Sequence, residues 1–278
     1  MQQKEGNFKG TGNYTLYWKS WLPDDKPVAV ILVAHGLGEH INRYTNLIND
    51  VVPLGFAVCG LDHQGHGKSE GIRCYVDRFQ VYIDDLKTFY EMVKKEYAGL
   101  KIFLLGHSMG GLIAAVYAEQ HQQDIDGLIL SAPLLKAGES VSQGTITVAK
   151  ILSAILPKMG VQTLDSTYLS HDKAVVEAYD SDPLVYRGKI TARLASELFT
   201  AVAEAQQKMS SITLPLLIMQ GTDDKLVNQE GARMLYEKAG SADKTLKLYE
   251  GFYHEIFNEP ERSKVFADLN DWLKRHTS

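Results

Sequence analysis

Short runs of consecutive apolar residues recur along the chain, and helical patterns separate them. A run that is apolar at every position is typical of a strand buried on both faces, as in a parallel sheet. The runs are Val28–Ala34, Phe56–Leu61, Ile102–Leu105, Leu128–Leu130 and Leu214–Met219. This recurrence predicts an α/β protein in which helices cover both faces of a mostly parallel sheet.

Weaker patterns complete the predicted sheet and its helices. Tyr14–Trp21 favours an antiparallel strand that ends at Pro23, and Thr245–Tyr249 alternates as a further strand. The segments with helical patterns are Tyr44–Val52, Arg78–Tyr97, Leu112–His121, Gly231–Ala239 and Arg262–Arg275.

One long stretch interrupts the alternation of strands and helices. Residues 134–211 look mainly helical and follow a strand in the middle of the predicted sheet. An insertion there would lie over the carboxyl ends of the strands, where open α/β sheets bind ligands. We therefore predict a core formed by residues 1–133 and 212–278 and a helical cap formed by residues 134–211.

Composition narrows the class of protein. The 278 residues are 45% hydrophobic and 23% charged, which excludes a disordered or collagen-like chain. A net charge of −5 argues against a protein held by nucleic-acid phosphates. Cys59 and Cys74 cannot form a disulfide scaffold. No segment approaches the ~20 apolar residues that cross a bilayer, and the polar segment 1–7 lacks the core of a signal peptide, so we expect a cytoplasmic protein.

Ser108 is the candidate nucleophile. It stands in Gly-His-Ser-Met-Gly, directly after the strand Ile102–Leu105 and directly before the helix Leu112–His121. A serine hydroxyl becomes accessible on a sharp strand-to-helix turn, and glycines flank it because side chains would collide there. The amino end of the following helix favours developing negative charge.

A serine hydroxyl needs a base, and in this architecture the acid and the base follow the serine in the chain. His254 is the best candidate base, because it follows Thr245–Tyr249 in a loop at the carboxyl edge of the sheet. Asp223 and Asp224 both follow Leu214–Met219 and are candidates for the acid that orients the imidazole. Adjacent residues on a turn point in different directions, so only one of them can do so.

Stabilising the oxyanion requires two backbone amides. Met109, which follows the serine, should provide one of them. The other should come from the glycine-rich loop 35–40 after the first buried strand, and Leu37 is our choice. We expect His35 to brace this loop. His63 and His66 lack further ligands for a metal, so we expect no metal and a structural loop there.

These residues resemble the monoacylglycerol lipase type of α/β-hydrolase, also described as serine aminopeptidase-like or lysophospholipase-like. The nucleophile motif alone identifies only the superfamily. The Gly-x-Gly-Glu-His loop together with the Tyr-x-Ser-Asp-Pro segment of the cap is much more specific. The matching segments span nearly the whole chain: His35–Tyr44, Leu61–Gly71, Gly106–Gly111, Tyr179–Leu184, Gln220–Leu226 and Tyr249–His254.

The resemblance implies several residue roles. In this family the acid lies three residues after the glycine of a Gly-x-x-Asp motif, which selects Asp224. Glu39, Arg43 and Tyr179 are implied to form a polar pocket for glycerol, since all three side chains can hydrogen-bond hydroxyls. The residues themselves equally allow an ion pair between Glu39 and Arg43 and a packing role for Tyr179.

An apolar helical stripe lies at 146–156 in the predicted cap. Its members are Val148, Ile151, Leu152 and Ile155. The stripe could pack on the core or on a neighbouring subunit. Alternatively, it could form an exposed rim that touches membranes and admits an acyl chain, with Lys150 and Lys158 near lipid headgroups. The resemblance favours peripheral membrane contact through the cap.

The leading hypothesis is a serine esterase that cleaves monoacylglycerol or a related lipid ester through an acyl-serine, without a cofactor. One alternative keeps the mechanism and changes the substrate to lysophospholipids or short-chain esters. An alternative of another class is a non-catalytic lipid-binding protein on a hydrolase scaffold. The presence of Ser108, Asp224 and His254 together argues against it.

Overall fold

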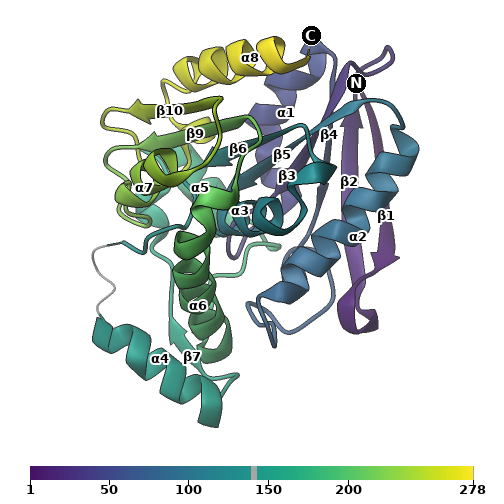
Figure 1. Cartoon of the computed structure of the whole chain (residues 1–278). Helices are drawn as coiled ribbons and strands as arrows, with labels where there is room; N and C mark the ends of the chain where they lie inside the picture. Colours follow the sequence, from purple (N-terminus) through teal and green to yellow (C-terminus); the bar gives the residue numbers. More distant parts are fainter. Residues whose placement is uncertain (139–142, 278) are drawn as a thin grey trace.

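The computed structural model describes residues 1–138 and 143–277 (Figure 1). An eight-stranded sheet runs in the order β1-β2-β4-β3-β5-β6-β9-β10. The pairs from β4 to β10 are parallel, whereas β2 pairs antiparallel with both β1 and β4. The strands are β1 (Gln2–Lys9), β2 (Thr15–Leu22), β3 (Ala29–Ala34), β4 (Phe56–Leu61), β5 (Lys101–His107), β6 (Gly127–Ser131), β9 (Leu216–Gly221) and β10 (Lys244–Tyr249). This confirms the predicted mostly parallel sheet.

Strand β1 is the element of the sheet that the sequence does not predict. Its residues are mostly polar and exposed, and the single large apolar side chain, Phe8, which packs against the core, makes no apolar pattern. The strand forms because its backbone pairs with β2 along its whole length, from Gln2 opposite Leu22 to Lys9 opposite Thr15. Charged side chains on such an edge strand also protect the sheet against pairing with other chains.

Helices cover both faces of the sheet, as predicted. The helices α1 (Thr45–Val51) and α8 (Ser263–Thr277) belong to one apolar layer, and α2 (Gln80–Glu96), α3 (Met109–His121) and α7 (Glu230–Lys238) belong to the other. Strand β3 shows why its run is apolar throughout. Its residues Val30 and Leu32 face one layer, whereas Ile31 and Val33 face the other.

Between β6 and β9 the chain leaves the sheet and forms a mainly helical segment (Figure 1). Its elements are α4 (Gln143–Ile155), β7 (Gly160–Gln162), α5 (Lys173–Ser181), β8 (Ile190–Thr191) and α6 (Ala192–Lys208). The antiparallel pair of β7 and β8 is not predicted from the sequence, and α6 packs against α3 of the core. The predicted cap, 134–211, includes residues 139–142, which lie outside the described residues; its boundaries stay a prediction.

Helix α4 packs on α6 and leaves three large apolar side chains in solvent, whereas Ile146 and Leu152 are half-buried. Small residues, Ala149 and Ser153, are its buried positions. Val148, Ile151 and Ile155 are 54%, 55% and 70% exposed. This exposure excludes packing on the core for these three residues. In the part of the chain that the structure describes, no helix has both the length and the apolar character needed to cross a membrane.

Candidate active site

Ser108 occupies a strained turn between β5 and α3. Its φ of 56° and ψ of −119° lie in a region that residues other than glycine rarely adopt. Three backbone hydrogen bonds hold it there: Ser108 N donates to Ser131 O, and Ser108 O accepts from Leu112 N and Leu134 N, at 3.0–3.1 Å. The turn is therefore fixed from both sides in the position that the Gly-His-Ser-Met-Gly motif predicts.

The motif glycine Gly110 explains how the turn can form. A Cβ atom at this position would lie 2.0 Å from the carbonyl oxygen of Ala34, at the end of β3. Only a residue without a side chain lets α3 begin this close to the neighbouring strand. The close approach brings the amino end of α3 beside the loop that follows β3.

The structure pairs His254 with Asp224. His254 Nδ1 lies 2.7 Å from Asp224 Oδ2, and their side chains are 5% and 0% exposed. Asp224 also accepts hydrogen bonds from Gln220 Nε2 at 2.9 Å and from the amides of Leu226 and Val227 at 2.9 and 3.0 Å. The neighbouring Asp223 is exposed, so it has the solvated position expected of the other carboxylate.

The electrostatics of the pair suit a base held by a carboxylate. Burial would raise the pKa of Asp224, but the His254 ring and the two amides outweigh burial and bring the pKa below its usual value. Burial would lower the pKa of His254, but the Asp224 carboxylate outweighs it and holds the pKa above 6.5. Asp224 is therefore ionised, and His254 carries its proton on Nδ1, which leaves Nε2 for a second partner.

Ser108 and His254 line one cavity of about 590 Å³, together with Leu37 and Asp224. This volume is within the range of small-molecule sites. In the described residues no hydrogen bond joins Ser108 Oγ to His254 Nε2, a contact that is often long before substrate binds. Apolar side chains from the core and from the segment after β6 form much of the wall: Leu134, Ala137, Leu164, Ile190, Ala195, Leu198, Phe199, Leu226 and Val227.

The loop 35–40 passes directly against the nucleophile. A Cβ atom at Gly36 would lie 3.3 Å from the Cβ of Ser108. Among the described residues, the amides of Leu37 and Met109 have no hydrogen-bond acceptor, so both remain available to a substrate oxygen. The segment between β6 and β9 also holds this loop, because Tyr186 N donates to Gly38 O at 2.8 Å.

His35 braces this loop, as we expect from its sequence position. Its Nε2 accepts from His63 N at 2.9 Å, so its Nδ1 carries the proton and donates to Gly36 O at 2.8 Å. The His63 and His66 rings lie 4.3 and 5.4 Å from that of His35, all three fully buried. Within the described residues, no three His, Cys, Asp or Glu side chains come together in a way that could hold a metal ion.

The buried histidines predict that acid destabilises the fold. Burial lowers the pKa of His66 and of His107 to about 4 and holds those of His35 and His63 well below 6.5. As the pH falls from about 6.5 to about 4, these histidines bind protons in the unfolded chain but not in the folded chain. Their contribution to stability is therefore lost over that window. We expect about 3 kcal/mol of loss for each of His66 and His107. His254, with its raised pKa, acts in the opposite direction, and so do Asp85 and Glu119, because burial raises their pKa values to about 6 and about 7.

Urea unfolding at about pH 7.5 and about pH 4.5 measures this loss. The unmodified chain is compared with the variant His66→Gln, because the net change also contains the opposite contributions of His254, Asp85 and Glu119. The variant lacks the His66 contribution and should lose about 3 kcal/mol less stability between the two pH values, whereas an equal change in both proteins would show that the His66 ring is not held neutral.

The three residues implied for the glycerol pocket come together, but none of them lines the large cavity. Glu39 and Arg43 form the ion pair that the residues themselves allow, at 2.7 Å. Arg43 lies over the ring of Tyr179, 4.6 Å from its centroid, and also binds Glu255, which the sequence analysis missed. The signal that could have identified Glu255 is its position directly after His254.

The family can be named from the whole chain. The family model described as "Serine aminopeptidase, S33" matches residues 25–261. The chain belongs to this family. Human monoglyceride lipase is 39% identical over 270 residues, which are 96% of this chain and 89% of the human protein. The monoacylglycerol lipase of Mycolicibacterium smegmatis is 35% identical over 274 residues, 99% of this chain and 98% of that protein.

A solved structure agrees with this assignment. The soluble variant of monoglyceride lipase from Saccharomyces cerevisiae, in complex with a substrate analog, is similar with a TM-score of 0.89 and 27% identity. The similarity covers 100% of this chain and 95% of that chain. This member of the serine aminopeptidase family therefore has the α/β-hydrolase fold. The family match includes Ser108, Asp224 and His254, whereas β1 and β2 precede it.

Proposed function

We propose that this chain is a serine esterase that hydrolyses monoacylglycerol to glycerol and a free fatty acid. The observation that carries the proposal is the placement of a strained Ser108 on the same cavity as a His254 that is paired with Asp224. The relatives named monoglyceride or monoacylglycerol lipase, which align over nearly the whole chain, support the choice of substrate.

The catalytic cycle follows from these positions. His254 Nε2 takes the proton of Ser108 as the hydroxyl attacks the ester carbonyl, and Asp224 holds the ring and stabilises the imidazolium. The amides of Leu37 and Met109 donate to the tetrahedral oxyanion, with about 3 kcal/mol per donor. The imidazolium then protonates the leaving glycerol, and water activated by His254 releases the fatty acid from the acyl-serine.

The two ends of the substrate meet different surroundings. The apolar wall of the 590 Å³ cavity suits an acyl chain. For the glycerol end, Arg43 is engaged with both Glu39 and Glu255, but the Tyr179 hydroxyl makes no hydrogen bond to another described residue. Tyr179 is therefore the member of that group with a free hydroxyl for a glycerol oxygen.

Rates on a small panel of esters test the choice of substrate. We expect kcat/KM for 2-oleoylglycerol to exceed that for lysophosphatidylcholine and for p-nitrophenyl butyrate, each measured by product release under identical conditions. A clear preference for lysophosphatidylcholine would show that the phospholipid is the substrate. A clear preference for the butyrate would show a short-chain carboxylesterase.

We further infer a cytoplasmic enzyme that meets membranes peripherally through α4. Val148, Ile151 and Ile155 present large apolar side chains to solvent on one helix, and Lys150 is exposed beside them. Burial of apolar surface supplies the attraction, because the −5 net charge offers none toward anionic lipid.

Ile151→Asp tests the membrane contact. We expect it to reduce sedimentation with phosphatidylcholine vesicles several-fold, because it places a charge in the apolar rim, and to leave p-nitrophenyl butyrate hydrolysis unchanged. Thr88→Asp adds the same charge at an exposed polar position of the core helix α2 and should bind vesicles as the unmodified chain does. Equal binding by all three proteins would exclude α4 as the contact.

A further inference from the structure

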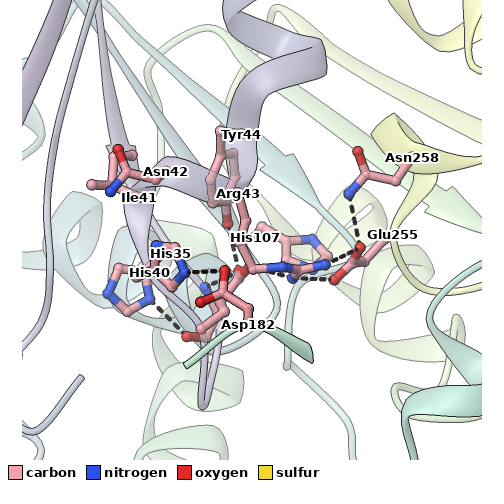
Figure 2. Close-up of polar contacts among 12 residues, drawn as sticks. His35, His40, Ile41, Asn42, Arg43, Tyr44, His107, Asp182, Glu255 and Asn258 are labelled. Carbon is pink, nitrogen blue, oxygen red and sulfur yellow. Dashed lines mark hydrogen bonds and ion pairs between the residues drawn. The ribbon is translucent and has the colours of Figure 1, made fainter. Parts of the chain in front are cut away.

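Glu39, Arg43 and Glu255 form a buried cluster of three charged side chains, of which Figure 2 labels Arg43 and Glu255. Arg43 Nη1 donates to Glu39 Oε2 at 2.7 Å and to Glu255 Oε1 at 2.6 Å, and Nη2 donates to Glu255 Oε2 at 2.9 Å. The side chains are at most 10% exposed. Two carboxylates share one guanidinium, so one negative charge in the cluster is uncompensated.

One end of the cluster holds the loop 35–40, which we call the oxyanion loop because Leu37 is the proposed donor to the oxyanion. Glu39 belongs to the loop 35–40 that also contains Leu37. Its Oε1 accepts from Gly36 N at 2.7 Å and from the Tyr44 hydroxyl at 2.8 Å. The carboxylate therefore fixes the part of the loop that passes against the nucleophile.

The other end holds the loop of the base. Glu255 directly follows His254, and its amide donates to Leu169 O at 2.7 Å. Its carboxylate accepts from Asn258 Nδ2 at 2.7 Å besides both nitrogens of Arg43. Arg43 thus connects loop 35–40 with the loop of His254, and catalysis requires that these two loops hold a fixed position relative to each other.

Several charged or titratable groups surround His254. Asp224 is bonded to it, and the ring of His107 lies 4.8 Å from its own ring, measured between centroids. Glu255 and Glu39 both favour its charged form and so contribute, after Asp224, to its raised pKa. Among the described residues, Arg43 in the cluster and Asp165 and Lys225 on the cavity wall are further charged groups nearby.

We propose that Glu255 is a positioning residue for the hydrolysis proposed above: through Arg43 it ties the loop of His254 to the oxyanion loop, and its charge stabilises the imidazolium. Position and charge are separate contributions, since one depends on the length of the side chain and the other on its ionisation. The variants Glu255→Asp and Glu255→Gln therefore distinguish them.

The experiment measures kcat and KM for 2-oleoylglycerol across pH in four proteins: the unmodified chain, E255Q, E255D and E250Q. Glu250 is an exposed carboxylate in the same loop and is the matched control. For E255Q we expect the acid limb of kcat/KM to move about one pH unit lower, because less negative charge faces His254, and kcat to fall about tenfold. For E255D we expect a similar fall in kcat with the acid limb unmoved. KM should change little in either.

Each outcome decides the proposal. An acid limb that stays in place in E255Q, or that moves equally in E250Q, overturns the role of the Glu255 charge. A folded E255D variant with the kcat of the unmodified chain overturns the positioning role. This result is decisive even if E255Q does not fold. An unmodified chain that hydrolyses no ester would instead refute the proposed function on which this inference rests.

Discussion

Replacing Ser108 with alanine should abolish monoacylglycerol hydrolysis. We expect kcat to fall by about six orders of magnitude, because the hydroxyl that forms the acyl-enzyme is lost and no other group can take its place. Hydrolysis of 2-oleoylglycerol, followed by fatty-acid release, measures the change.

The fold should survive this substitution. The hydrogen bonds that hold the turn use the backbone of Ser108, and alanine keeps all of them. The thermal unfolding midpoint of Ser108→Ala is therefore the control, and it should match that of the unmodified chain. Turnover that persists within tenfold of the unmodified rate in a folded variant would contradict a serine mechanism at this position.

Replacing Asp224 with asparagine should lower kcat by about four orders of magnitude. An amide cannot accept the Nδ1 proton in the same way, so the ring adopts the wrong tautomer for a base, and the imidazolium loses its counter-charge. The steady-state rate on 2-oleoylglycerol measures the effect, and a shift of the His254 pKa to lower values should accompany it, since the Asp224 carboxylate is what holds that pKa up.

The neighbouring carboxylate provides the matched control. Asp223 is exposed, and His254 Nδ1 is bonded to Asp224, so Asp223→Asn should keep kcat within about twofold. The two variants remove the same charge from adjacent positions. If Asp223→Asn were the inactive one, the assignment of the acid would be wrong.

Much of the fold could be predicted because its strands are buried on both faces. The run Phe56–Leu61 matches β4 residue for residue, since every side chain of that strand is buried. Strand β1 could not be predicted, because it is stabilised by backbone pairing with β2 and its mostly polar side chains show no pattern. The β7–β8 pair is too short and too exposed to leave a signal.

Some residues of the active site could likewise be predicted from the sequence, and others could not. Ser108 and its flanking glycines could be predicted because the backbone geometry of the turn restricts which residues fit. The choice between Asp223 and Asp224 needed the family spacing, since two adjacent carboxylates look alike in a sequence. The contact of Glu255 with Arg43 spans 212 positions, so no local pattern reveals it.

Labelling with a fluorophosphonate probe, followed by peptide mass spectrometry, tests the central claim most directly. The account predicts one covalent adduct, on the peptide that contains Ser108, and at least a hundredfold slower labelling in His254→Ala because the base is absent. A folded chain that remains unlabelled, or that carries the adduct on a different residue, would contradict it.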